Sequence, residues 1–458
     1  RRTGAAVFGV VRMVGRTGIT IRGVTFASGG GYANGSGGGL YAQNSSFTLA
    51  DSTVVSNFAY EGGGGGIYLD TCTATITNCT VAWNASWTSW GGTGGGIHAK
   101  AGTVSILNCT VRNNYANAQN VGCPAYGGGV YVESGGATVR NCRIHDNWLN
   151  TSTGPRCGHG VFLQNGSTLV ENCVIATNKG QGVFYSNGVA TVRNSILWNN
   201  GDDLVSFRTN GVGTLTNIWY CDVEDGDNNG VQGCISTNPL LVDYAGRDFH
   251  LQSLGGHWTA GGWVQDYEQH SPCIDAGDTN SAFAGEPAPN GARVNIGAYG
   301  NTEQASKSFP PHAGLLVTTR PVVFSGVGAV TLNGKLWSTG GGSAPKLYFC
   351  WGPVDGGTNG FGGWANADYV GSNWAAGQVF SRTVTNLLSG STYRFRCYAT
   401  NSTGIDWSDY CLSFQAPYAW YVATSGSGSP GTNWASAFTN VQTALNAAST
   451  GDTVCIAG

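Results

Sequence analysis

Three charged residues occupy the same position in three consecutive repeats of the sequence: Asp70, Lys100 and Glu133. A metal-assisted polysaccharide lyase needs clustered carboxylates and a lysine or arginine base, and this set offers both residue types but no cluster. A retaining glycoside hydrolase needs two carboxyl groups about 5 Å apart. Repeats stacked about 4.8 Å apart place Asp70 and Glu133 about 9.6 Å apart, which fits only an inverting hydrolase. We therefore expect an exposed ion-pair ladder and no catalytic residues, and keep Asp70, Lys100 and Glu133 only as the alternative catalytic candidates.

The repeat that carries these residues consists of a glycine cluster, an apolar-x-apolar triplet and an alternating stretch that ends in x-Asn-Cys. Its spacing varies from copy to copy, which argues against a helical solenoid and favours short fixed strands joined by variable loops. Alternation with a period of two is also what strands require. With degenerate copies at both ends, the chain is predicted to form a right-handed parallel β-helix of about eight coils. The triplets begin at Leu40, Ile67, Ile97, Val130, Val161 and Val183.

A column of residues that tolerate the left-handed backbone conformation runs through the repeats. Every member is Gly, Asp or Asn, so we predict a left-handed corner between the second and third strands of each coil. An adjacent inward column holds four cysteines. Their side chains are parallel, whereas a metal site needs side chains that converge, so we interpret them as small buried thiols and not as a metal or redox array. The corner column is Gly23, Asp51, Asn78, Asn108, Asn141, Asn172 and Asn194, and the cysteines are Cys79, Cys109, Cys142 and Cys173.

The outward positions of the first strand in each coil form a column of aromatic rings. Such a column on a soluble protein must be covered. The cover could come from a protein contact with another subunit or the second domain, from loops of the same stack, or from the sugar rings of a glycan. Of these three, we expect the protein contact. The column is Tyr41, Tyr68, His98, Tyr131, Phe162 and Phe184.

The repeats resemble those of the pectin-lyase-like family of right-handed parallel β-helices, in its secreted bacterial branch. Residues 238–308, which begin NPLLVDYAGRDFHLQS and end in NTEQASKS, are similar to the closing segment of such helices. The resemblance implies an all-β fold and two functional classes, polysaccharide-degrading enzymes and structural or adhesive proteins. Because no carboxylate cluster is evident, we predict a protein that is not an enzyme, with polysaccharide binding or degradation as the alternative.

The change in periodicity predicts four segments along the chain. They are residues 1–308, the parallel β-helix with its closing segment; 309–312, a linker; 313–417, a sandwich; and 418–458, a cap-like strand–helix–strand segment. The sandwich resembles a fibronectin type III domain, because Tyr393 and the alternating residues after it match the late strands and the tyrosine corner. The last segment looks like the amino-terminal cap of a β-helix, with Thr439 as the helix N-cap.

Composition limits the partners and the compartment. Charged residues make up 10% of the 458 residues, and the net charge of −3 gives no reason to expect a nucleic acid partner. No apolar run is long enough to span a membrane, and no cysteine or histidine spacing indicates a metal site or a cofactor. We predict a secreted, extracellular or cell-surface protein, with disulfides between Cys221 and Cys234 and between Cys123 and Cys157.

The two ends of the chain predict self-assembly. The sequence opens in coil-like residues with no cap ahead of them, and it ends in a cap with nothing to cover. We predict that the cap segment of one subunit docks on the first coil of the next, in a head-to-tail filament, a surface layer or a covalent tandem repeat. Surface glycans are the second partner class. The predicted contact joins Val441, Leu445, Ala448, Val454 and Ile456 to Val11, Met13, Ile19 and Ile21.

Overall fold

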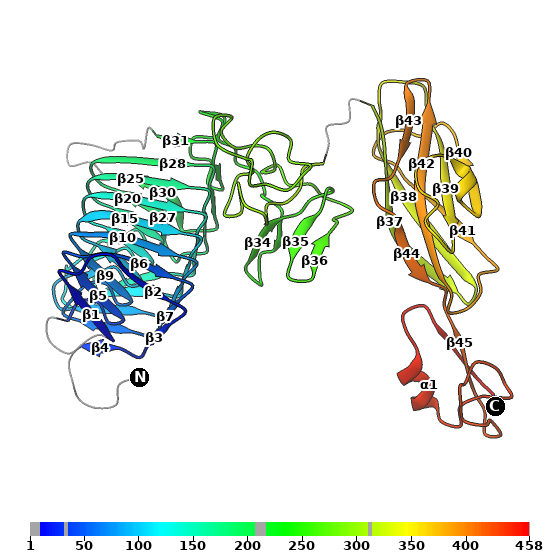
Figure 1. The fold of residues 1–458 in the computed structure, drawn as a ribbon, viewed down its shortest axis with the longest axis horizontal. Coiled ribbons are helices and arrows are strands. Elements are labelled where there is room, and N and C mark those ends of the chain that lie inside the picture. The colour runs from blue at the N-terminus through cyan, green and yellow to red at the C-terminus, as the bar shows by residue number, and fades with distance from the viewer. Residues whose placement is uncertain (1–9, 32–34, 207–216, 310–313, 458) are drawn as a thin grey trace. The chain divides into compact units, whose positions relative to one another are not determined.

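The computed structural model describes residues 10–31, 35–206, 217–309 and 314–457 (Figure 1). The chain divides into two compact units, residues 1–310 and 311–458. Within the described residues, every regular element is a strand except one α-helix and one 3-10 helix, so the predicted all-β class is confirmed. Of the predicted linker, only Phe309 lies within the described residues.

Three parallel sheets, each with eight strands among the described residues, wind through the first unit (Figure 1). The first contains β1 (Val11–Val14), β5 (Leu40–Gln43), β9 (Ile67–Asp70), β14 (Ile97–Ala99), β19 (Val130–Val132), β24 (Val161–Leu163), β27 (Gln181–Tyr185) and β30 (Asp202–Ser206). The second contains β2 (Ile19–Arg22), β6 (Ser46–Ala50), β10 (Cys72–Thr77), β15 (Gly102–Leu107), β20 (Gly136–Arg140), β25 (Ser167–Glu171), β28 (Val189–Arg193) and β31 (Ile218–Trp219). The third contains β3 (Thr25–Ala27), β7 (Thr53–Val55), β11 (Thr80–Ala82), β16 (Thr110–Arg112), β21 (Arg143–His145), β26 (Val174–Ala176), β29 (Ile196–Trp198) and β32 (Asp222–Val223).

The stack continues past the eighth strand of the third sheet. Ile235 forms a parallel bridge with Asp222, and the Cys221 backbone N–H donates to Cys234 Sγ at 3.5 Å. The solenoid is therefore longer than the repeats predict. The sequence hides this extension because the polar turn at residues 224–233 breaks the alternation.

Two smaller parallel sheets, which the sequence does not predict, form from the connections between coils. Connections that leave stacked strands run side by side, so their backbones can pair. One sheet contains β4 (Gly30–Gly31), β8 (Phe58–Tyr60), β12 (Ala85–Thr88), β17 (Tyr115–Ala118) and β22 (Trp148–Thr151). The other contains β13 (Gly92–Thr93), β18 (Ala125–Tyr126) and β23 (Arg156–Cys157).

The strand register places the inward residues in one continuous core. Ile76 pairs with Ile106, Ile106 pairs with Val139, and all three are fully buried, as are the four stacked cysteines. The left-handed corners are present as predicted, with φ between 47° and 67° at all seven positions. A second left-handed corner, which the sequence does not predict, follows the third strand with φ between 51° and 57°. It consists of Ser28, Ser56, Trp83, Asn113, Asp146, Thr177 and Asn199.

A stack of buried asparagine side chains, the amide ladder, follows this second corner. Asn114 Oδ1 accepts from the backbone N–H and from the side-chain amide of Asn84, at 3.0 and 2.9 Å. The Asn114 amide donates to Val81 O at 2.9 Å and to Asn147 Oδ1 at 3.0 Å. Each rung thus satisfies buried backbone groups that would otherwise lack partners. The amide ladder comprises Asn57, Asn84, Asn114, Asn147, Asn178 and Asn200.

The closing segment packs along the outer face of the third sheet. Its residues Leu241, Phe249 and Ile296 join a buried cluster with Val174 and Ile196 of β26 and β29. The segment therefore covers apolar side chains that point outward from the last coils. Its strands are β33 (Leu241–Asp243), β34 (Asp248–Leu251), β35 (His257–Thr259) and β36 (Gly262–Val264).

The second unit begins with an antiparallel sandwich whose buried residues include Leu332, Phe349 and Phe395. Tyr393 OH accepts a hydrogen bond from the Leu388 backbone N–H at 3.1 Å, the bond that a tyrosine corner makes. One sheet contains β37 (Leu315–Gly326), β38 (Ala329–Thr339) and β41 (Val379–Val384). The other contains β40 (Asn366–Gly371), β39 (Lys346–Gly352), β42 (Thr392–Asn401), β43 (Gly404–Trp407) and β44 (Leu412–Gln415), and the 3-10 helix η1 (Phe361–Gly363) precedes β40.

The C-terminal segment consists of β45 (Ala419–Val422), α1 (Val441–Ala447) and β46 (Thr453–Ile456), with the two strands paired in parallel. The helix N-cap is Asn440, which accepts a hydrogen bond from the Gln442 N–H at 2.7 Å. The prediction of Thr439 is wrong by one residue, because the extended residue that precedes the helix is Asn440, with φ of −136°. Ala444 is the buried residue of the helix.

Candidate functional site

The three catalytic candidates lie in neighbouring coils, where two of them form an ion pair and the third contacts a buried histidine. Lys100 Nζ lies 3.6 Å from Asp70 Oδ2, which also accepts from Gln43 Nε2 at 3.1 Å. Glu133 Oε2 lies 3.0 Å from His98 Nε2. Burial lowers the pKa of His98, which favours its neutral form, so Glu133 is held by a hydrogen bond. The expected ion-pair ladder is thus present only as the Asp70–Lys100 pair.

The aromatic column is in register along the first sheet but is not an exposed face. Tyr41 is half-buried, whereas Tyr131 and Phe162 are 3% exposed. The ring of Tyr126, from β18, lies 5.0 Å from that of Phe162, and Cys157 of β23 packs against the same cluster. Connections of the same chain therefore provide the cover. The expected protein contact is wrong because these connections fold back as the three-stranded sheet. The other buried members are Tyr68, His98 and Phe184.

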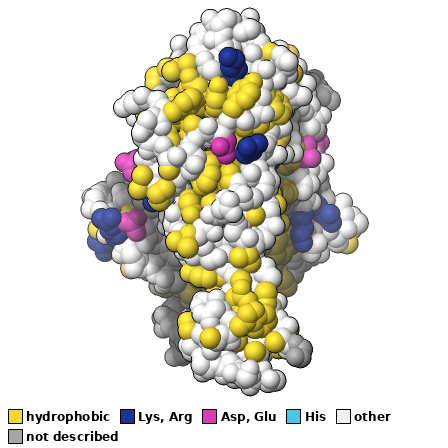
Figure 2. Space-filling model, turned by 90° about the vertical axis from the view of Figure 1, so that its right-hand side faces the viewer, with side chains coloured by type: hydrophobic (Ala, Val, Ile, Leu, Met, Phe, Trp, Pro, Cys, Tyr) yellow, Lys and Arg dark blue, Asp and Glu magenta, His cyan; other side chains and the backbone are white. Residues whose placement is uncertain are grey.

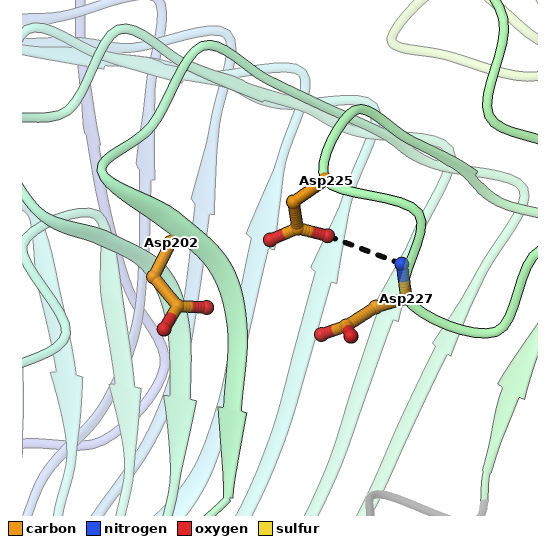
Figure 3. A group of neighbouring side chains, drawn as sticks. All are labelled: Asp202, Asp225 and Asp227. Atoms are coloured by element: carbon orange, nitrogen blue, oxygen red, sulfur yellow. Dashed lines mark hydrogen bonds between the residues drawn. The ribbon is translucent and has the colours of Figure 1, made fainter.

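Three carboxylates gather at the late end of the stack, where the sequence pattern predicts no metal site (Figure 3). Asp202 comes from β30, while Asp225 and Asp227 lie on the loop after β32. Their oxygen atoms lie within 4.8 Å of one another, and Asp225 Oδ1 accepts from the Asp227 N–H at 3.2 Å. The sequence hides the cluster because Asp202 is remote in sequence and reaches the others only through stacking.

The electrostatics of this cluster follow from burial and like charge. Both effects, burial first and then the charge of Asp225, raise the pKa of Asp202 and of Asp227. Burial also raises the pKa of the neighbouring Asp203 to about 6. Three carboxylates are the oxygen ligands that Ca²⁺ takes, although exposed acidic groups are also common without an ion.

The parallel register and the stacked corners are the features of a right-handed β-solenoid. Residues 9–232 match the family described as "Right handed beta helix region". No curated protein matches the chain. Among the described residues of the chain, no helix has the length and apolar character needed to cross a membrane.

The first coil of the β-helix region carries part of the predicted assembly contact. Within the described residues, no strand pairs with the outer edges of β1, β2 and β3. Met13 is buried and Val11 and Ile21 are partly buried, whereas Ile19 is 38% exposed and Val14 is 43% exposed. This end therefore combines unpaired edges with accessible apolar side chains.

The C-terminal segment leaves most of its apolar side chains in solvent. Leu445 is 53% exposed, Val441 is 40% exposed and Ile456 is 59% exposed, while Val454 and Ala448 are partly buried. Figure 2 views the side of the second unit and shows hydrophobic side chains over the segment that carries β45, α1 and β46. Helix α1 thus buries the face that carries Ala444. The face predicted for docking, which carries Val441 and Leu445, is accessible to solvent.

Neither predicted disulfide is formed, and all four cysteines are free. Cys221 and Cys234 stack in one inward column, where the coil spacing of about 4.8 Å exceeds the Cβ separation of about 3.8 Å that a disulfide needs. Cys157 packs against the rings of the aromatic column, whereas Cys123 packs against a separate alanine-rich cluster. Burial raises the pKa of Cys157 to about 11.

Proposed function

We propose that this protein is an extracellular structural or adhesive protein that assembles head to tail. In this proposal, residues 419–458 of one copy dock on the first coil of the β-helix region of the next copy or tandem repeat. The fibronectin type III-like sandwich acts as a spacer. The observation that carries the proposal is the exposure of Val441, Leu445 and Ile456 on a segment too small to bury them itself.

The size of the C-terminal segment supports this proposal. Helix α1 has seven residues, fewer than the roughly 12–15 that even a good isolated helix needs in water. A two-stranded sheet such as β45–β46 is also marginal by itself. Both elements therefore gain stability from an apolar surface that covers Leu445 and Val441.

The first coil offers a surface of the matching kind. A strand from another copy can pair with the outer edge of β1, β2 or β3, as in β-strand addition. The contact joins two different surfaces, so its repetition without closure gives a filament. The alternative, binding or cleavage of a polysaccharide by the β-helix region, is less well supported, because Asp70 is held in an ion pair with Lys100 and Glu133 in a hydrogen bond with His98.

Replacing Leu445 with aspartate should weaken self-association of the intact chain at least tenfold. Burial of a leucine side chain contributes about 1.5–3 kcal/mol, and a tenfold change in affinity corresponds to about 1.4 kcal/mol. Sedimentation velocity over a concentration series measures the change. Thr443→Asp is the matched control, because Thr443 is an exposed polar residue of the same helix. Equal association of the Leu445 variant and the control would contradict the proposal.

A further inference from the structure

The outer face of the five-stranded sheet in the second unit carries a line of aromatic rings, the aromatic row. Its residues occupy paired positions on four neighbouring strands, and ring centroids along it are 5.1, 5.8 and 4.6 Å apart. Phe361 of η1 lies against three of these rings, at 5.2, 5.0 and 5.9 Å. The aromatic row consists of Tyr369, Tyr348, Tyr398 and Trp407, with Phe361 beside them.

The aromatic row is not part of the sandwich core. The core lies on the opposite face of the same strands, where Phe349, Cys397 and Ala399 are fully buried. Tyr369 is 48% exposed and Phe361 is 39% exposed, and the other three rings are partly exposed. Figure 2 shows hydrophobic side chains gathered on the sandwich when the second unit is viewed from the side on which β40 lies in Figure 1. An exposed set of this kind indicates a binding surface.

The charges around the aromatic row favour a neutral partner. The row itself contains no charged side chain. Arg396, two residues before Tyr398 on β42, is paired with Asp355 at 2.8 Å. Lys346, two residues before Tyr348, and Arg394, four residues before Tyr398, are two further exposed cations on the same strands. Two separate cations and one neutralised arginine do not form the continuous cationic surface that a polyanion requires.

The size of the aromatic row favours a narrow partner over a folded protein. An aromatic side chain offers about 150–250 Å² when it is fully covered, and each of these five is less than half exposed, so the row offers about 600 Å² at most. A standard protein interface takes about 800 Å² from each partner. The four rings on the strands form a single file with Phe361 along one side, which fits a single extended chain.

We propose that the aromatic row binds a single chain of a neutral polysaccharide. The apolar C–H faces of sugar rings would stack on the aromatic rings, and their hydroxyl groups would bond to the phenol groups of the row. This activity goes beyond head-to-tail assembly, because it would attach each subunit to a glycan.

The test is affinity electrophoresis of the full chain in gels that contain laminarin, xyloglucan, galactomannan or polygalacturonate. We expect retardation by at least one of the three neutral glycans and none by polygalacturonate. The double substitution Tyr398→Ala and Trp407→Ala should weaken binding at least tenfold. Trp90→Ala is the matched control, because Trp90 is 78% exposed and lies in the other unit. Circular dichroism and the melting temperature show whether each variant is folded.

Three outcomes would overturn the proposal. One is the absence of retardation by all three neutral glycans. Another is retardation that is the same for the intact protein and for a folded double variant. If the double variant does not fold, Tyr369→Ala is used for the same comparison. The third is loss of self-association in the double variant without an effect on glycan binding, which would make the aromatic row a protein contact.

Discussion

Replacing Asn114 with leucine should destabilise the β-helix region by about 3–9 kcal/mol, although the two side chains have nearly the same shape. The substitution removes the acceptor for two donors of Asn84 and the donor that reaches Val81 O. Each buried polar group left without a partner costs about 1–3 kcal/mol. The loss is comparable with the whole stability of many domains, about 5–15 kcal/mol.

Urea unfolding followed by circular dichroism measures this effect. The matched control is Asn150→Leu, because Asn150 is an exposed asparagine on strand β22 and its replacement should change the stability by about 0.5 kcal/mol or less. Equal unfolding midpoints for the two variants would show that the amide ladder does not stabilise the stack.

Removing residues 419–458 should abolish assembly and leave both remaining parts of the chain folded. The deleted residues form a small buried cluster of their own around Val422, Phe438 and Ala444, separate from the cores of the solenoid and the sandwich. Light scattering should therefore give the mass of a monomer. Circular dichroism should show that the truncated chain keeps the strand content of the same residues in the intact chain. Fibres of unchanged appearance from the truncated chain would contradict the proposal.

A mixing experiment sharpens this prediction. A truncated copy keeps its first coil and can accept the C-terminal segment of an intact copy, but it offers no segment to the next. Truncated protein added to intact protein should thus shorten the assemblies in proportion to its fraction, and the Leu445→Asp variant should do the same. Assemblies of unchanged length would mean that the contact lies elsewhere.

The sequence predicts those features of the fold that few residue types can satisfy. The first left-handed corner is occupied by Gly, Asp and Asn alone, so its positions fix the strand register. The second corner also contains Trp83 and Thr177, which carry no such signal. The amide ladder did have a signal, because each rung stands five residues after the inward column that holds Cys79 and Cys109.

The candidate sites were harder to predict because they depend on connections of variable length. Alternation places Tyr131 and Phe162 outward correctly, but only the paired connections reveal that Tyr126 covers them. Asp202 and Asp225 meet only because successive coils stack. The aromatic row depends on strand pairing in the sandwich, which brings Tyr348, Tyr398 and Trp407 together from separate strands.

Photo-crosslinking between isotopically distinct copies tests head-to-tail docking most directly. Unlabelled chains with a photoreactive amino acid in place of Leu445 are mixed with ¹⁵N-labelled chains, irradiated and digested. We predict crosslinks from position 445 of unlabelled copies to the first coil, residues 10–27, of labelled copies. Crosslinks confined to the same copy, or to other regions of the labelled chain, would contradict the proposed assembly.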